Sequence, residues 1–167
     1  VISRCMVLDG IVEAPNLPKA AGIAVMNART NNINATISKC VFVGKLICGP
    51  RAGAYGPQTG GIAAYSASST IENCLVSADI TVKSNDTIQS TVVNAGGVCG
   101  YINGVTFAKN VVYGGSITIE GTPATKHVGR IYGYNAFNNG SFTENLAYEG
   151  FTVDGQTAVA GHAAGGL

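Results

Sequence analysis

The 167 residues contain no tryptophan, and only 11% of them are charged, which leaves a formal net charge of +1. A surface that binds nucleic acid needs clustered Lys and Arg, and none is present, so we expect no nucleic-acid partner. No apolar run approaches the roughly 18 residues that a spanning helix requires, so we expect no membrane insertion. Residues 1–10 carry no basic stretch followed by an apolar one, and we expect any signal peptide to have been removed or to lie upstream.

Glycine is abundant instead, with 23 residues, while Ser, Thr and Asn supply most of the polarity. A neutral surface rich in hydroxyl groups suits a protein that is solvated outside the cell. We therefore expect the chain to be secreted, either extracellular or at the cell surface.

One motif recurs five times along the chain, beginning at Ile2, Ile37, Ile71, Phe107 and Phe142. Its fourth position forms a column in which the spacings are 35, 34, 36 and 35 residues: Cys5, Cys40, Cys74, Asn110 and Asn145. The position after this column is apolar in all five copies. Such agreement indicates a stacked repeat architecture with a period of about 35 residues.

A second motif precedes the first in each full repeat and reads AGIAVM, GGIAAY, GGVCGY and GRIYGY. Its apolar anchors are Ile23, Ile62, Val98 and Ile131, and Leu167 follows the last of them by 36 residues. The chain therefore begins and stops in mid-repeat. We interpret residues 1–167 as a single repeat domain whose ends are either cut or continued by another chain.

Alternating apolar residues predict strands and not helices. Ile80 and Val82, like Ile117 and Ile119, place two apolar side chains on one face with Thr between them. We predict an all-β fold, a parallel β-solenoid (β-helix) of about 4.5 coils of roughly 35 residues, with about three strands per coil. Right-handed winding is expected as the commoner hand. Long irregular stretches at 48–59, 83–95 and 154–164 are predicted to be loops that project from this core.

The paired motifs GGIAAY…STIENCLVSADIT and GGVCGY…VTFAKNVVYGGSIT resemble the GLUG repeat family, and the resemblance covers nearly all of the chain. It departs from the family pattern at Met26, Arg130, Asn110 and Asn145. GLUG repeats occur in large secreted or surface-attached proteins, including bacterial adhesins and some surface proteases. The resemblance implies a repeat that accompanies catalytic domains without supplying catalysis.

The column of Cys5, Cys40 and Cys74 favours reduced thiols that stack inside the coil as small hydrophobic groups. A disulfide between neighbouring coils and a metal site are the alternatives, and no CxxC or Cys-His cluster supports the second. Asn110 and Asn145 continue the column, where stacked amides can bond to each other and to turn backbone. We expect these five residues to form a structural core ladder, with a ligand-binding role for the two amides as the alternative.

Residues with reactive side chains are sparse. His127 and His162 lie 35 residues apart, so two imidazoles would meet on adjacent coils as a metal site or an acid–base pair. Glu72 and Glu144 are assigned to one column, roughly 9.6 Å apart by strand spacing, as an inverting pair of carboxylates would require. In both cases the interpretation that we favour is solvated surface, so we expect no catalytic residue, no metal ligand and no cofactor.

Two further surface features follow from the repeat. An ice-binding face would need a flat column of threonines, and Thr81, Thr118 and Thr152 are assigned to one column. Val12 and Ile47 occupy this column in the earlier copies and no second threonine column runs beside it, so we do not favour this function. Sequons for N-glycosylation fall in predicted loops at Asn34, Asn85 and Asn139.

A stacked fold without convergent reactive residues indicates a non-catalytic extracellular structural or adhesive repeat module. It would serve as a filament or fibre subunit, or as a stalk segment of a larger surface protein. Its expected partners are copies of itself stacked end to end or neighbouring repeats of the same parent chain, together with surface glycans or host proteins. The alternative function is a carbohydrate-active β-helix enzyme or a carbohydrate-binding module.

Overall fold

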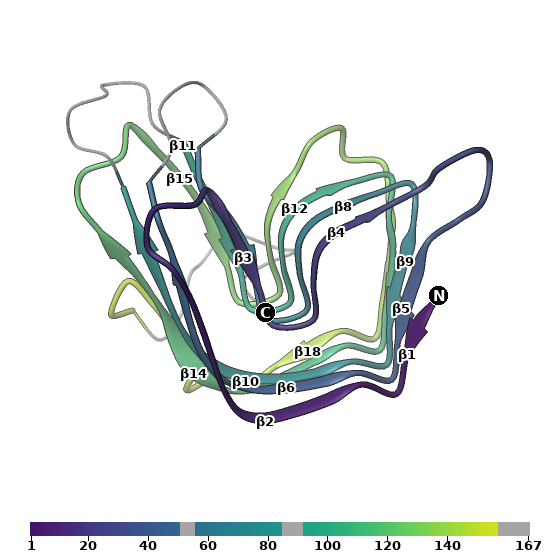
Figure 1. The fold of residues 1–167 in the computed structure, drawn as a ribbon, viewed down its shortest axis with the longest axis horizontal. Coiled ribbons are helices and arrows are strands. Elements are labelled where there is room, and N and C mark those ends of the chain that lie inside the picture. The colour runs from purple at the N-terminus through teal and green to yellow at the C-terminus, as the bar shows by residue number, and fades with distance from the viewer. Residues whose placement is uncertain (51–55, 85–91, 157–167) are drawn as a thin grey trace.

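The computed structural model describes residues 1–50, 56–84 and 92–156, and these residues form strands joined by turns and loops, with no helix among them. The strands stack in parallel, coil upon coil, through about four turns (Figure 1). In the view of Figure 1 the chain runs clockwise and recedes from the viewer after its N-terminal coil, so the winding is right-handed. The predicted parallel β-solenoid is therefore confirmed.

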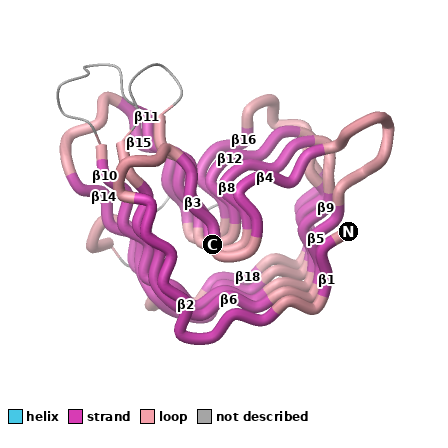
Figure 2. Tube along the Cα trace, viewed as in Figure 1, coloured by secondary structure: helices cyan, strands magenta, loops and turns pink. Residues whose placement is uncertain are grey.

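Each coil contributes strands to four parallel sheets, which Figure 2 shows as four stacks of strands. The first sheet contains β1 (Ile2–Ser3), β5 (Thr36–Ser38), β9 (Thr70–Glu72), β13 (Thr106–Ala108) and β17 (Ser141–Thr143). The second contains β2 (Met6–Ala14), β6 (Val41–Cys48), β10 (Leu75–Lys83), β14 (Val111–Glu120), β18 (Leu146–Ala147) and β19 (Thr152–Val153). The third contains β3 (Lys19–Ala21), β7 (Gln58–Gly60), β11 (Val92–Gly96) and β15 (Thr125–Gly129). The fourth contains β4 (Ala24–Ala28), β8 (Ala63–Ala67), β12 (Cys99–Asn103) and β16 (Tyr132–Asn135).

The prediction of three strands per coil is wrong, because the third sheet supplies a fourth strand to each coil. Its strands are three to five residues long, and β7 and β11 both lie partly inside the ranges 48–59 and 83–95 that were predicted to be loops. Short runs such as Gln58–Gly60 carry too few apolar residues to show the alternation that identifies a strand.

Like residues of successive coils lie side by side, as the period of the sequence predicts. In the first sheet Ile37 pairs with Ile71, and Ile71 pairs with Phe107. In the second sheet Ile80 lies between Leu46 and Ile117. All of these side chains are buried, so each coil buries its apolar columns against its neighbours.

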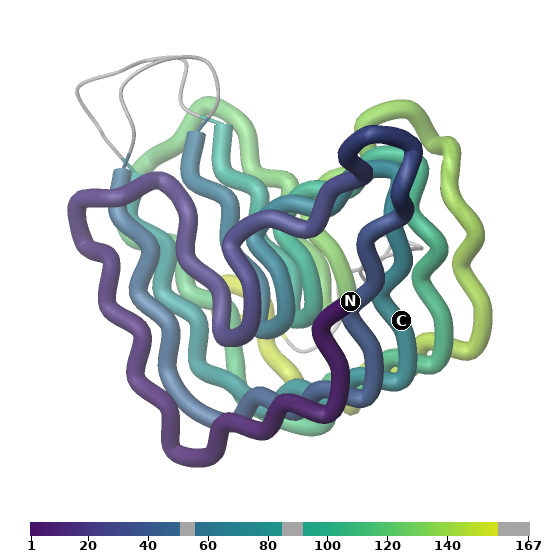
Figure 3. The backbone as a smooth tube through the Cα atoms, turned by 45° about the vertical axis from the view of Figure 1, so that its right-hand side comes forward, coloured from purple at the N-terminus to yellow at the C-terminus, as the bar shows by residue number. Residues whose placement is uncertain are grey.

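The cross-section of the coil is indented, because the third and fourth sheets run into its middle and back out again (Figures 1 and 3). The turn between these two sheets rests on the inner face of the second sheet. A Cβ atom added at Gly61 would overlap the Val76 side chain and would lie 2.7 Å from the Gly97 carbonyl oxygen. Glycine at this turn therefore lets the indentation reach the second sheet.

Candidate functional site

The corner between the first and second sheets repeats in every coil. The residue before the corner has a left-handed backbone in each copy, with φ between 53° and 57°: Arg4, Lys39, Asn73, Lys109 and Glu144. This conformation costs a residue other than glycine about 1–2 kcal/mol, so the packing of the corner must hold it in place. The next residue belongs to the predicted ladder, and we call these five positions the corner column: Cys5, Cys40, Cys74, Asn110 and Asn145.

Side chains of the corner column form hydrogen bonds at the corners of their own coil and of neighbouring coils. The thiols of Cys40 and Cys74 each donate to the carbonyl oxygen two residues earlier, at 3.3 Å. Asn110 is fully buried, and its Oδ1 accepts the Cys74 N–H at 3.1 Å. Its Nδ2 donates to the Ile71 carbonyl oxygen at 3.0 Å and to Asn145 Oδ1 at 2.9 Å. The corner column thus satisfies buried polar groups through contacts between coils.

A second arrangement joins the third and fourth sheets. One column of polar side chains runs along the third sheet: Lys19, Gln58, Asn94 and His127. A column of tyrosines runs along the fourth sheet, where ring centroids lie 5.2 Å apart for Tyr65–Tyr101 and 5.4 Å apart for Tyr101–Tyr134. The Nζ atom of Lys19 lies 4.9 Å from the centroid of the Tyr65 ring, and the rings of His127 and Tyr134 are 4.4 Å apart. The two columns therefore face each other.

Two amide oxygens of this polar column have no hydrogen-bond partner. Gln58 and Asn94 are each only 5% exposed, and their Oε1 and Oδ1 atoms are buried without a donor. A buried acceptor without a partner costs about 1–3 kcal/mol, so these two amides destabilise the fold where they stand. Neither column was predicted from the sequence. The signal was present, because each polar residue lies four positions before an apolar anchor of the second motif, and each tyrosine lies three positions after such an anchor.

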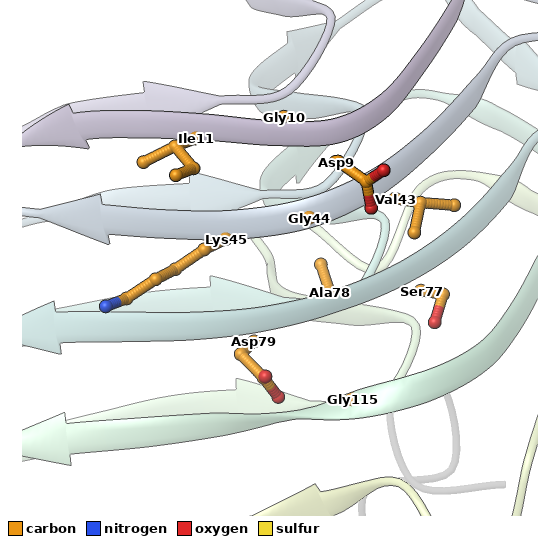
Figure 4. Close-up of a pocket in the computed structure, with 10 residues that line it drawn as sticks. All are labelled: Asp9, Gly10, Ile11, Val43, Gly44, Lys45, Ser77, Ala78, Asp79 and Gly115. Carbon is orange, nitrogen blue, oxygen red and sulfur yellow. The ribbon is translucent and has the colours of Figure 1, made fainter.

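A shallow groove of about 430 Å³ crosses the outer face of the second sheet (Figure 4). Its floor is a column of small residues: Gly10, Gly44, Ala78 and Gly115. Ile11, Lys45 and Asp79 stand in register on three successive strands beside it. The carboxylates of Asp9 and Asp79 come from strands two coils apart, and Asp79 accepts the Ser116 hydroxyl at 3.1 Å. The groove presents charged side chains of both signs on an open surface.

The first coil exposes residues whose counterparts are buried in later coils. Ile2 is 37% exposed, whereas its partner Ile37 is fully buried. Cys5 is exposed and Cys40 is buried. Val7 is half-buried, and its partner Phe42 has no exposed surface. Among the described residues no strand pairs with the edge of β1 and β2 that faces away from β5 and β6, so this edge is an apolar stacking face.

Two assignments of carboxylate and threonine columns are wrong. Glu72 pairs with Ala108, which pairs with Thr143, whereas Glu144 stands one position later and approaches Lys109 at 4.0 Å. The proposed pair of carboxylates therefore does not share a column.

The threonine column is also interrupted. Thr81 pairs with Thr118 and with Ile47, and the first coil places Glu13 in this column where Val12 was expected. Thr152 lies beside Ser116 and not beside Thr118. Irregular register near Val7 and Gly10 in β2, and the separation of β18 from β19, shift residues away from the positions that counting assigns.

The remaining predicted sites lie apart from one another. The His127 ring lies against the Tyr134 ring at an interplanar angle of 34°, whereas His162 lies outside the described residues, so the structure does not test the pairing of the two histidines. Asn34 and Asn139 are exposed in connections between sheets, and Asn139 Oδ1 accepts the Gly104 N–H at 2.9 Å. Asn85 also falls outside the described residues.

Within 1–50, 56–84 and 92–156, no three His, Cys, Asp or Glu side chains are grouped as a metal ion would require. The same residues include no helix with the length and apolar character needed to cross a membrane.

Comparison with family models, curated proteins and solved structures finds no match to this chain. The resemblance to GLUG repeats thus stays a prediction from the motifs.

Proposed function

We propose that the chain is a non-catalytic structural or adhesive repeat module that works outside the cell or at its surface. The observation that carries this proposal is the stacking face of the first coil, where Ile2, Cys5 and Val7 are uncovered. Burying an aliphatic side chain is worth about 1.5–3 kcal/mol, so covering this face with another coil would be favourable. The neutral, hydroxyl-rich composition supports the extracellular setting.

The occupant of the stacking face is a coil of the same kind, supplied by a neighbouring repeat of the same parent chain or by a second copy of the chain. Among the described residues, each of the four sheets ends at the first coil in a strand with one open edge, β1 to β4, and a parallel coil would extend all of them at once. A contact of this kind is heterologous, and repetition of it builds an open filament. Such a filament subunit has a structural role that needs no catalytic group.

Light scattering and electron microscopy across a concentration series test this function. We expect association that grows with concentration, and we expect Ile2→Lys to weaken it by placing an ammonium group on the stacking face. Ile11→Lys is the matched control, because Ile11 pairs with Lys45 and the next coil already carries lysine there. A chain that remains monomeric at every concentration, or two variants that behave alike, would contradict the proposal.

A second candidate function is binding of a hydroxyl-rich ligand such as a saccharide, which the half-buried tyrosine column of the fourth sheet favours. Tyrosine rings supply an apolar face for a sugar ring and a hydroxyl group for hydrogen bonding. Titration calorimetry with a panel of oligosaccharides tests this function, with Tyr65→Ala as the variant expected to lose binding. Absence of binding by every oligosaccharide of the panel would refute it.

A further inference from the structure

The thiols at the start of the corner column are stacked on the first two coils. Ser3 pairs with Ser38 and Met6 pairs with Val41, so Cys5 and Cys40 stand opposite each other. The Val41 N–H donates to the Cys5 carbonyl oxygen at 2.8 Å, which confirms the direct contact of the two corners.

The distance between these two cysteines suits a covalent link. Adjacent strands lie about 4.8 Å apart, which falls within the range of about 4.4–6.8 Å found between the Cα atoms of disulfide-bonded cysteines. Both cysteines are reduced in the structure.

The exposure of the cysteines falls from the first coil to the later ones. Cys5 is exposed, whereas Cys40 directly behind it is fully buried and Cys74, one coil further in, is 1% exposed. Cys48 and Cys99 are buried elsewhere, on the second and fourth sheets. Burial raises the pKa of the Cys40 thiol, and its neighbours Cys5 and Cys74 perturb it further. A reagent in solution therefore meets Cys5 first, with Cys40 as the adjacent thiol.

We propose that Cys5 and Cys40 are a site of disulfide formation that ties the first coil to the second, with a small disulfide such as oxidised glutathione as the oxidant. The Cys5 thiolate attacks one sulfur of oxidised glutathione, whose S–S bond breaks, and one glutathione leaves and takes up the proton that Cys5 lost. The Cys40 sulfur then attacks the sulfur of Cys5 and displaces the second glutathione, which takes up the proton from Cys40. Two cysteine thiols are oxidised, and one glutathione disulfide is reduced to two thiols.

The link joins two neighbouring coils of the solenoid. A bond between Cys5 and Cys40 holds β1 and the start of β2 against β5 and β6. It goes beyond the proposed stacking function, because it concerns how one chain fastens two of its own coils together.

The test exposes the folded, reduced chain to oxidised glutathione at a concentration at which the chain is monomeric, and follows its mass. We expect a product that has lost two hydrogen atoms and retains no glutathione. Trypsin places the five cysteines in five different peptides, with Cys5 in 5–19 and Cys40 in 40–45, so the linked pair is identified directly. A stable glutathione adduct on Cys5, a link to any other cysteine, or a dimer joined through Cys5 would overturn the proposal.

Two variants separate the steps of the reaction. Cys5→Ser changes an exposed residue and is expected to leave the folded chain unreactive, because the remaining thiols are buried. Cys40→Ala is expected to stop at the Cys5–glutathione adduct, provided that circular dichroism shows the native spectrum. Closure of an internal disulfide in the Cys40→Ala chain would also refute the proposed pair. The peptide map of the oxidised wild-type chain identifies the linked pair by itself. The proposal therefore remains testable even if Cys40→Ala fails to fold.

Discussion

Asn110 offers the sharpest test of how the coils are held together. Its amide makes three hydrogen bonds to neighbouring coils, at 2.9–3.1 Å, and its side chain is fully buried. Asn110→Ala removes all three, and it leaves the Cys74 N–H and the Ile71 carbonyl oxygen buried without this partner. A hydrogen bond is worth about 0.5–1.5 kcal/mol, and leaving its partner unsatisfied costs about 1–3 kcal/mol. We therefore expect Asn110→Ala to lower the free energy of unfolding by about 2–4 kcal/mol.

Urea unfolding followed by circular dichroism measures this change, as a lower midpoint with an unchanged slope. Asn110→Cys is the informative companion, because the first three coils carry cysteine at this corner and their thiols donate to the backbone. We expect it to lose clearly less stability than Asn110→Ala. Asn34→Ala, in an exposed connection, is expected to stay within about 0.5 kcal/mol of wild type. An Asn110→Ala variant as stable as wild type, or an Asn110→Cys variant as damaged as Asn110→Ala, would refute the reasoning.

Three further predictions concern other parts of the chain. A Cβ atom at Gly100 would lie 2.6 Å from a backbone nitrogen of the third sheet, so Gly100→Ala should unfold at a much lower urea concentration than Gly114→Ala, whose nearest neighbour is a serine hydroxyl at 3.2 Å. An undiminished midpoint for Gly100→Ala would contradict the close contact of the two sheets. Burial raises the pKa of Cys48 and Cys99 from 9.0 to about 12, so the neutral thiols stabilise the fold below pH 9, and stability should fall as the pH rises from about 9 to about 12. A flat pH dependence of the urea midpoint over this range would be inconsistent with these buried thiols. Expression in a glycosylating secretory host should add a glycan at Asn34, because this sequon is exposed, and mass spectrometry of the Asn34→Gln chain should show that glycan lost.

The period of the sequence was sufficient to predict the coil and its interior columns. A residue type that recurs every 34–36 positions, such as the Cys and Asn of the corner column, needs the same surroundings in each copy. Stacked parallel strands provide those surroundings, since equivalent residues lie one strand spacing apart. Ile37, Ile71 and Phe107 are buried in one such column for this reason.

The indented cross-section was not predictable from alternation. It depends on close backbone contacts at glycines such as Gly61 and Gly100, and it uses strands as short as Gln58–Gly60. Glycine in a repeat indicates that some close contact exists, but not which element makes the contact. The polar and tyrosine columns beside it were missed for the same reason, since they become a site only when the two sheets face each other.

Errors in the outer columns have a local cause. In β14 the register shifts by one residue, so Gly114 and not Tyr113 pairs with Ser77, and a similar shift occurs after Val7 in β2. Each extra residue changes which side chains share a column. Comparison of the motif copies locates the extra residue of β14 near Gly114 and Gly115, but it does not reveal the one after Val7 in β2. The interior columns were assigned correctly, because the buried face of each strand carries apolar residues on both sides of the bulge.

The central claim is that equivalent residues of successive coils lie directly beside one another. Nuclear Overhauser contacts between the Ile71 side chain and its two column neighbours test it most directly in solution. The structure predicts cross-peaks from the Ile71 methyl groups to the methyl groups of Ile37 and to the ring of Phe107, which lie 34 and 36 residues away in sequence. Cross-peaks from Ile71 to other parts of the chain, with none to Ile37 or Phe107, would contradict the stacking and every role inferred from it.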